Sequence, residues 1–353
     1  MVLNVVQRTL FQKARAPGGG DQAVGLDDAA CRALILLVAR DLDRAAAFPD
    51  IPDVPDLYAA DPPDVLRVEA PVEPLEMFER LLEACGQDAG MYFSSLASLL
   101  KARLKYRKIL STQPISTIDQ VGPRSLLEYG LLPTSSLAAL LFWRKWVFDI
   151  DNRSGQETGY LFEPIIANSI GGTPVPAKRS PVRRRSGTGG RQIECLRGTD
   201  ACELKLRVTI AASGQGRWGE ELAFPEECKA SGYKPVLVVF DPTANPKLSE
   251  LAMAFEVAGG DVHIGANAWS HLEQAAGTTM SVFLDKYVRR PLQDLLGSVQ
   301  TELPELTMKL DAEHVVFALG NRSYEVTRAR PDMDLLEGGD ELPDDVQETL
   351  PGV

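Results

Sequence analysis

The sequence lacks several features that define common protein classes. Its 353 residues contain no apolar run long enough to span a membrane, and the N-terminus has none of the regions of a signal peptide. The three histidines and five cysteines show neither zinc-ligand spacing nor a disulfide framework. No P-loop and no dinucleotide-binding glycine motif is present. We therefore expect a cytoplasmic protein whose chemistry depends on neither a nucleotide cofactor nor zinc.

Positive charge is also scarce, but it is unevenly distributed. The net charge is −12, yet residues 331–353 hold eight acids and no Lys or Arg, so the rest of the chain sums to −12 + 8 = −4. Residues 171–217 hold ten basic and three acidic residues, a local charge of +7. For binding a polyanion the local charge of a surface matters more than the net charge of the chain. The negative net charge therefore weakens the case for a nucleic-acid partner but does not exclude it.

The apolar pattern divides the chain into four parts. Residues 1–150 read as a helical subdomain for DNA wrapping or dimerisation, with a loose arm over 1–20 and helices at 26–47, 72–86, 91–110, 122–129 and 135–149. Residues 151–300 alternate helix and strand and predict an α/β (α+β) core, a mixed sheet flanked by helices. A β-hairpin follows at 301–330, turning at Gly320-Asn321, and an acidic, disordered tail at 331–353.

The most informative segment is a predicted hairpin at residues 191–209. Strand-like runs at 191–196 and 201–209 flank the polar turn Arg197-Gly-Thr-Asp200. A four-residue loop pairs Cys195 with Cys202 and sets Glu194 opposite Glu203. Because side chains alternate along a strand, Glu203 and Lys205 share that face.

Two carboxylates directly opposed on a sheet repel each other unless a cation lies between them. The hairpin therefore predicts a Mg²⁺ site formed by Glu194, Glu203 and the backbone carbonyl of Leu204. Lys205 would hold the attacking water or stabilise a charged transition state, as phosphodiester hydrolysis requires. The alternative is a surface hairpin with solvated charges.

The sequence contains a control for this interpretation. Glu227-Cys-Lys229 is also a Glu-x-Lys triplet, but it lies in a helix-like stretch, where residues two apart do not share a face. Only Glu203-Leu-Lys205 lies on a strand, so only there do we expect the carboxylate and the ammonium to converge.

The acidic residues and the lysine together resemble the PD-(D/E)XK nuclease superfamily. Glu163 precedes the sheet, Glu194, Glu203 and Lys205 follow, and the expected α-β-β-β-α-β order is that of the superfamily core. The segment from 203 to 241, which includes the stretch Ser-Gly-Gln-Gly-Arg, is similar to type II restriction endonucleases of the ApaLI-like family. The resemblance implies cleavage of DNA to 5′-phosphate products.

Two positions depart from the superfamily pattern. Its first acid is usually Asp, and here Asp200 rivals Glu194, although Asp200 lies in the turn and on the opposite face from Glu203. Glu163 directly precedes Pro164, which is acceptable in a first helical turn, so Glu163 is expected to cap its helix.

Several residues around the hairpin suit DNA. The segment with Arg183, Arg184 and Arg185 is a phosphate clamp or a solvated loop. After the Lys strand, Ser213, Gln215 and Arg217 can donate hydrogen bonds, and Gln and Arg are the usual readers of base edges, unless this is an ordinary connecting loop.

These features favour a Mg²⁺-dependent type II restriction endonuclease acting on double-stranded DNA. Because palindromic sites match two-fold protein symmetry, a homodimer is expected, with a DNA methyltransferase as its genetic partner. Two alternatives remain: a structure-selective repair or recombination nuclease on the same core, and a DNA-binding protein whose core is inactive.

Overall fold

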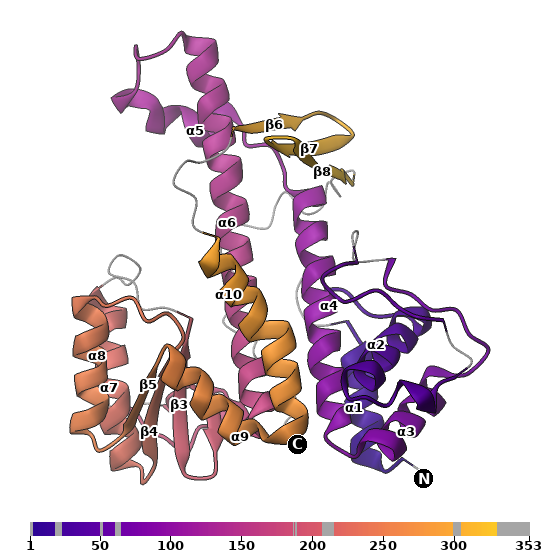
Figure 1. Cartoon of the computed structure of the whole chain (residues 1–353). Coiled ribbons are helices and arrows are strands. Elements are labelled where there is room, and N and C mark those ends of the chain that lie inside the picture. Colours follow the sequence, from indigo (N-terminus) through magenta and orange to yellow (C-terminus); the bar gives the residue numbers. More distant parts are fainter. Residues whose placement is uncertain are drawn as a thin grey trace.

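A computed structural model gives a mixed α/β molecule, as the sequence predicts (Figure 1). It contains a five-stranded sheet in the order β1-β2-β3-β4-β5 and a three-stranded sheet in the order β6-β7-β8, with helices packed around both. The structure describes residues 3–17, 23–49, 52–60, 65–185, 187, 189–206, 215–298 and 305–329, with only the backbone at 124, 125, 215–217 and 296. The acidic tail predicted at 331–353 lies outside these residues.

The hairpin register predicted from the sequence is confirmed. Cys195 lies opposite Cys202 in an antiparallel pair, and β3 then runs parallel to β4, which runs parallel to β5. The turn is tighter than expected because Arg197 still pairs with Asp200. Gly198 then takes a φ of 59°, which an L side chain adopts only with strain. The strands are β1 (Thr173–Val175), β2 (Ile193–Arg197), β3 (Asp200–Lys205), β4 (Lys234–Val239) and β5 (Asp261–Ile264).

Helices cover both faces of the larger sheet. On one face α7 (Gln215–Ala230) and α8 (Pro246–Val257) pack through apolar side chains such as Phe224 and Leu251. On the other face lie α6 (Thr134–Ser169) and α9 (Ala266–Leu284), and Gly277 interrupts α9. A π-helical stretch (Asp285–Arg289) leads into α10 (Arg290–Gly297).

The helix predicted at 135–149 extends much farther than expected, because it is part of α6 (Thr134–Ser169), which is 36 residues long. Pro164 lies inside it, so the expectation that Glu163 caps a helix is wrong. A proline inside a helix costs about 3 kcal/mol. The buried side chains of Ile165 and Ile166, worth roughly 1.5–3 kcal/mol each, offset that cost. The helix therefore continues through the domain boundary expected at residue 150, and it carries Glu163 near its C-terminal end.

The N-terminal helices are largely as predicted, with one correction. Instead of a loose arm, α1 (Val5–Arg15) is a helix capped by Asn4 and Gln7, and its Phe11 ring lies 5.5 Å from that of Phe93. The polar composition of this segment concealed a single buried aromatic on a short helix. The other helices of this region are α2 (Asp28–Asp41), capped by Asp27, then α3 (Pro74–Cys85), α4 (Ala89–Thr112) and α5 (Ile118–Val121).

The second sheet contains one strand more than predicted. The turn at Gly320-Asn321 is confirmed, but β6 (Leu306–Leu310) adds to the hairpin of β7 (His314–Leu319) and β8 (Arg322–Thr327). This sheet packs on α4 and α6 through a small core that includes Trp146. None of the described helices is long and apolar enough to cross a membrane.

Candidate active site

The β2–β3 hairpin brings the predicted acid and lysine together. Glu203 and Lys205 lie two residues apart on β3, and the Lys205 Nζ is 3.0 Å from the Glu203 Oε1. Both side chains are mostly buried, at 15% and 17% exposed. An ion pair this well shielded from water is screened far less than one at the surface. The hypothesis of a solvated surface hairpin is therefore wrong.

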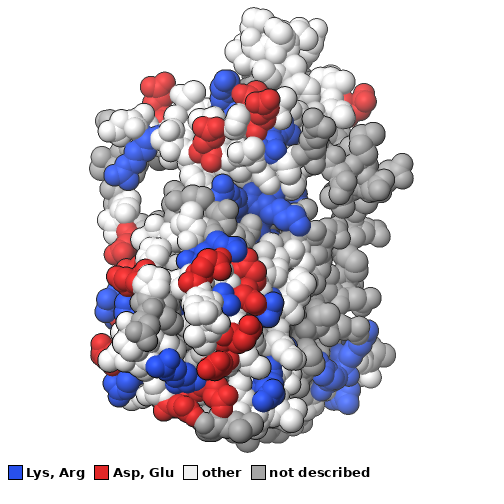
Figure 2. All heavy atoms as spheres, turned by 90° about the vertical axis from the view of Figure 1, so that its right-hand side faces the viewer, with Lys and Arg blue, Asp and Glu red and all other residues white. Residues whose placement is uncertain are grey.

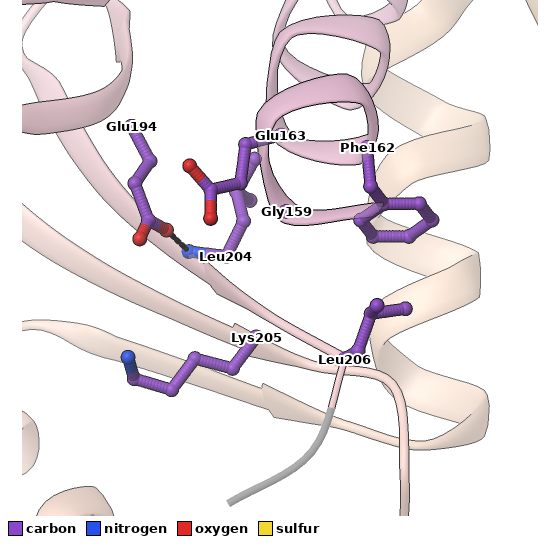
Figure 3. A pocket seen from close by; sticks show the side chains of 7 residues that line it. All are labelled: Gly159, Phe162, Glu163, Glu194, Leu204, Lys205 and Leu206. Atoms are coloured by element: carbon purple, nitrogen blue, oxygen red, sulfur yellow. Dashed lines mark hydrogen bonds between the residues drawn. The ribbon is translucent and has the colours of Figure 1, made fainter. Parts of the chain in front are cut away.

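A cavity of about 220 Å³ opens beside this pair (Figure 3). Lys205 borders it together with Glu194 from β2 and Glu163 from α6. Figure 3 shows the Glu163 carboxylate directed toward Glu194. The full lining is Gly159, Phe162, Glu163, Glu194, Leu204, Lys205 and Leu206. The long helix α6 and the β2–β3 hairpin thus bring acidic groups and one cation to a single cavity.

Burial and mutual repulsion perturb these carboxyl groups. Burial, reinforced by the charges of Glu203 and Glu163, raises the pKa of Glu194 well above its usual value. The Glu194 carboxylate accepts a hydrogen bond from the Leu204 N–H, which opposes this rise in pKa. Burial and the Glu203 charge likewise raise the pKa of Glu163 to about 7. The cavity therefore holds more acidic groups than it can ionise without a compensating cation.

Lys205 is the one cation among the cavity's described lining residues. Burial alone lowers the pKa of this lysine, but the charges of Glu203, Glu194 and Glu221 outweigh it and raise the pKa above the usual value. The ammonium is therefore fully charged near neutral pH. It lies where it can attract an anion that enters the cavity.

Glu221 is a residue of the site that the sequence interpretation missed. Its Oε2 lies 3.7 Å from the Lys205 Nζ, and it approaches from α7, on the side away from α6. A signal for it exists in the sequence. Glu221 is three residues before Phe224 and seven before Cys228, both buried, so helical periodicity puts all three on the face toward the sheet.

The rival first acid lies elsewhere. Asp200 is at the opposite end of β3, where it pairs with Arg197 on one side and Lys234 on the other. Its charge helps Asp261 to raise the pKa of Lys234. Asp200 does not line the cavity, whereas Glu194 and Leu204 both do.

The predicted DNA-binding residues are only partly visible. Arg184 lies 3.1 Å from Glu220 and Arg185 lies 3.4 Å from Glu226, so acids on α7 offset the charge of both. The exposed Arg183 donates its backbone N–H to the Ser231 hydroxyl. Ser213 lies outside the described residues, and Gln215 and Arg217 lie in the first turn of α7 with side chains that are not described. Their contact with DNA stays a prediction.

The donor chemistry of the cavity suits a divalent cation. Mg²⁺ prefers carboxylate, carbonyl and water oxygens, and Glu163, Glu194 and Glu203 provide the carboxylates. As their side chains stand, one oxygen of Glu194 accepts from Leu204 and one of Glu203 accepts from Lys205. Among the described residues, no three His, Cys, Asp or Glu side chains are already gathered as a metal-binding group. The fit therefore rests on donor type and on the uncompensated buried charge.

Comparisons with known proteins identify the family of this chain. A family model described as ApaLI-like restriction endonuclease matches residues 60–289, more than half of the chain. The type II restriction enzyme ApaLI of Acetobacter pasteurianus is 46% identical over 272 residues, which cover 72% of each of the two proteins. No solved structure matches the chain.

Proposed function

Because this chain belongs to the ApaLI-like restriction endonuclease family, it is a sequence-specific type II restriction endonuclease, and we propose that the cavity between α6 and the β2–β3 hairpin is its catalytic site. The observation that carries the proposal is the convergence of Glu163, Glu194 and Lys205 on one cavity, with Glu203 bonded to that lysine. A phosphodiester fits this chemistry because its hydrolysis adds negative charge to a group that is already anionic.

Type II restriction enzymes generally use a divalent metal, and Mg²⁺ is the ion we assign to this site. Glu194, Glu203 and the backbone carbonyl of Leu204 would hold it, with Asp200 as the rival first acid. When bound, the ion would lower the pKa of a water and neutralise charge on the scissile phosphate. The raised pKa of Glu194 supports this role, since a nearby cation stabilises the ionised form of a carboxyl group whose burial disfavours ionisation.

The remaining residues supply charge and orientation. Lys205, held by Glu203 at 3.0 Å, would orient the attacking water or stabilise the charge of the pentacoordinate transition state at phosphorus. Glu163, whose pKa is raised to about 7, can exchange a proton near neutral pH at the edge of the cavity. We therefore assign it to proton transfer or to a contact with a metal-bound water.

DNA recognition is proposed for the basic segment and for the start of α7. Arg183, Arg184 and Arg185 would contact phosphates, which requires Arg184 and Arg185 to exchange their α7 acids for the DNA backbone. Ser213, Gln215 and Arg217 would read bases or contact phosphates. A homodimer would match a palindromic site, and a DNA methyltransferase would protect the host genome.

Two substitutions test the site directly. Glu203→Gln and Lys205→Met should each lower the rate of plasmid cleavage by at least about 1,000-fold, because each removes a charge that stabilises the transition state more than the bound substrate. DNA binding measured in Ca²⁺ should change by less than about threefold. The matched controls are Lys229→Met, from the helical triplet, and Glu256→Gln on α8, both exposed side chains. Full cleavage activity in both site variants would show that the cavity is not catalytic.

The same assay separates the alternative functions. Discrete fragments from linear plasmid with Mg²⁺ support a restriction endonuclease. Cutting confined to branched DNA would indicate a structure-selective nuclease instead. Binding without any cutting, over a range of divalent ions, would indicate an inactive core.

A further inference from the structure

The end of the molecule that contains α5 carries an apolar surface. It consists of residues 115–141, which we call the finger: α5, a 3₁₀ turn (Gly122–Leu127) and the first turns of α6 (Figure 1). The finger has a small core of its own, formed by Val121, Leu137 and Leu141. Its other large apolar side chains are exposed: Ile115, Ile118, Leu126, Leu127, Tyr129, Leu131, Leu132 and Leu140.

This apolar surface is too large for an isolated solvent-facing element. Leu127 is 95% exposed and Leu131 is 75% exposed, and the eight side chains together expose the equivalent of about five complete ones. At roughly 100–150 Å² for each large apolar side chain, the finger presents on the order of 500–750 Å². If a two-fold contact covered all of it, the two copies together would bury roughly 1,000–1,500 Å², close to the size of a standard stable interface.

The charges on the finger favour protein over DNA as the partner. The described cations at its base are already paired: Arg144 with Glu128, and Lys145 with Asp149 at 2.5 Å. On the face that Figure 2 shows, the described part of the lobe at the top of the molecule is almost free of charged side chains. A DNA backbone needs cations to replace its counterions. A second apolar surface needs none, and two identical neutral surfaces do not repel each other.

We propose that the finger is the surface through which two copies of this chain associate, in a two-fold arrangement that buries the same leucines on both sides. The proposal rests on the proposed function, for which two active sites must act on the two strands of one duplex. It assigns the contact to this element rather than to α1–α4 or to the β6–β8 sheet.

The finger lies well away from the cavity. Leu140 and Glu163 are both on α6 and 23 positions apart, which corresponds to about 35 Å at 1.5 Å per residue. A substitution in the finger therefore should not disturb the catalytic groups directly. It should separate the two subunits while each retains its own hydrolytic site.

The test is Leu127→Arg, alone and combined with Leu131→Glu, examined by sedimentation equilibrium without DNA. The wild-type protein should be a dimer, and each variant should raise the dimer dissociation constant at least about 30-fold, the effect of losing one central contact. The circular dichroism spectrum should stay that of the wild type, since both side chains are exposed, and the thermal midpoint should fall only by the stabilisation that dimerisation provides. The matched control is Val257→Arg on α8, 71% exposed and outside the finger, which should remain dimeric.

The outcomes separate this inference from the proposed function. A wild-type monomer, or a finger variant that dimerises as tightly as Val257→Arg, overturns the inference even if cleavage is intact. A variant that stays dimeric but loses affinity for DNA would show that the finger contacts nucleic acid instead. Conversely, Glu203→Gln should dimerise normally, so its loss of cleavage tests the active site alone. In plasmid digests the monomeric variants should accumulate nicked circles, because the two strands are then cut in separate encounters.

Discussion

The three-residue pattern Glu-x-Lys occurs twice in the chain, and the two copies make different contacts. In Glu203-Leu-Lys205, on β3, the glutamate and lysine are 3.0 Å apart, and the lysine borders the cavity. In Glu227-Cys-Lys229, on α7, the glutamate is buried against Arg191 at 2.8 Å while the lysine is exposed. Strand periodicity brings i and i+2 together, and helical periodicity separates them. The same two residue types thus form an ion pair with each other on the strand and separate contacts on the helix.

The surroundings of the two glutamates differ as much as their partners. The charge of Glu203 raises the pKa of two other acids, Glu163 and Glu194. Glu227 lies among donors: Arg191 and the backbone N–H of Arg185. Around the strand triplet the acids therefore outnumber the one described cation of the cavity, Lys205, whereas Glu227 is compensated by its donors. A cluster in which acids outnumber cations is suited to binding a further cation. A buried glutamate whose charge is compensated by an arginine is suited to stabilising the fold.

The largest effect that separates the two triplets is on stability. Glu227→Ala leaves the buried Arg191 guanidinium without its closest acid, so the free energy of unfolding should fall by about 3–5 kcal/mol. At a temperature where the variant is folded, its cleavage rate should stay near that of the wild type. Urea denaturation followed by circular dichroism measures the first quantity and a plasmid assay the second.

A double substitution provides the control for this effect. Glu227→Leu combined with Arg191→Met replaces both charges by apolar side chains of similar size and should recover most of the lost stability. If Glu227→Ala were as stable as the wild type but inactive, the helical triplet would be part of the active site and the contrast drawn above would be wrong.

A smaller effect should appear in the pH dependence of stability, and it arises at Glu163 on α6, beside the strand triplet. The folded-state pKa of Glu163 is raised to about 7, above its ordinary value, so the folded protein binds this proton more tightly than the unfolded chain. Its contribution to stability is present below about pH 4.5 and is lost as the pH rises through about 7. Without metal, the thermal midpoint should therefore decline over this range.

Glu163→Gln should flatten that decline, because the amide does not ionise. Adding Mg²⁺ should raise the wild-type midpoint near pH 8 and have a smaller effect on the variant. Glu256→Gln, exposed on α8, should retain the wild-type pH profile. An unchanged decline in Glu163→Gln would mean that another group, such as Glu194, is responsible for it.

Much of the site follows from local rules in the sequence. The Cys195–Cys202 register, the shared face of Glu203 and Lys205 and the helical placement of Glu227 all depend on turn length and on periodicity, which short segments specify. These predictions are confirmed because they require no knowledge of distant contacts.

The errors came from contacts between distant segments. The helix through Pro164 persists because Ile165 and Ile166 are buried in the core, which the proline alone does not indicate. The pairing of Arg184 with Glu220 depends on how α7 packs against the basic segment. No local pattern reports such packing, so a stretch that read as a cluster of unpaired cations is in fact partly neutralised.

The smallest expected effect concerns Glu221. This residue lies on α7, the helix that also carries Glu227-Cys-Lys229, and its carboxylate contacts Lys205 of the strand triplet. Burial lowers the pKa of Lys205, and the charge of Glu221 helps those of Glu203 and Glu194 to raise it, so Glu221→Gln should lower the lysine pKa. The ammonium still stays charged near neutral pH, so the cleavage rate there should fall by no more than about 10-fold, through looser orientation of Lys205, with little change in KM, and any loss of activity at alkaline pH should set in at a lower pH than in the wild type. Glu221→Asp should restore part of both. The adjacent Glu220→Gln, which loses contacts to Arg184 and Arg191 instead, should leave the pH profile unchanged. Equal pH profiles for the two variants would limit Glu221 to a structural role.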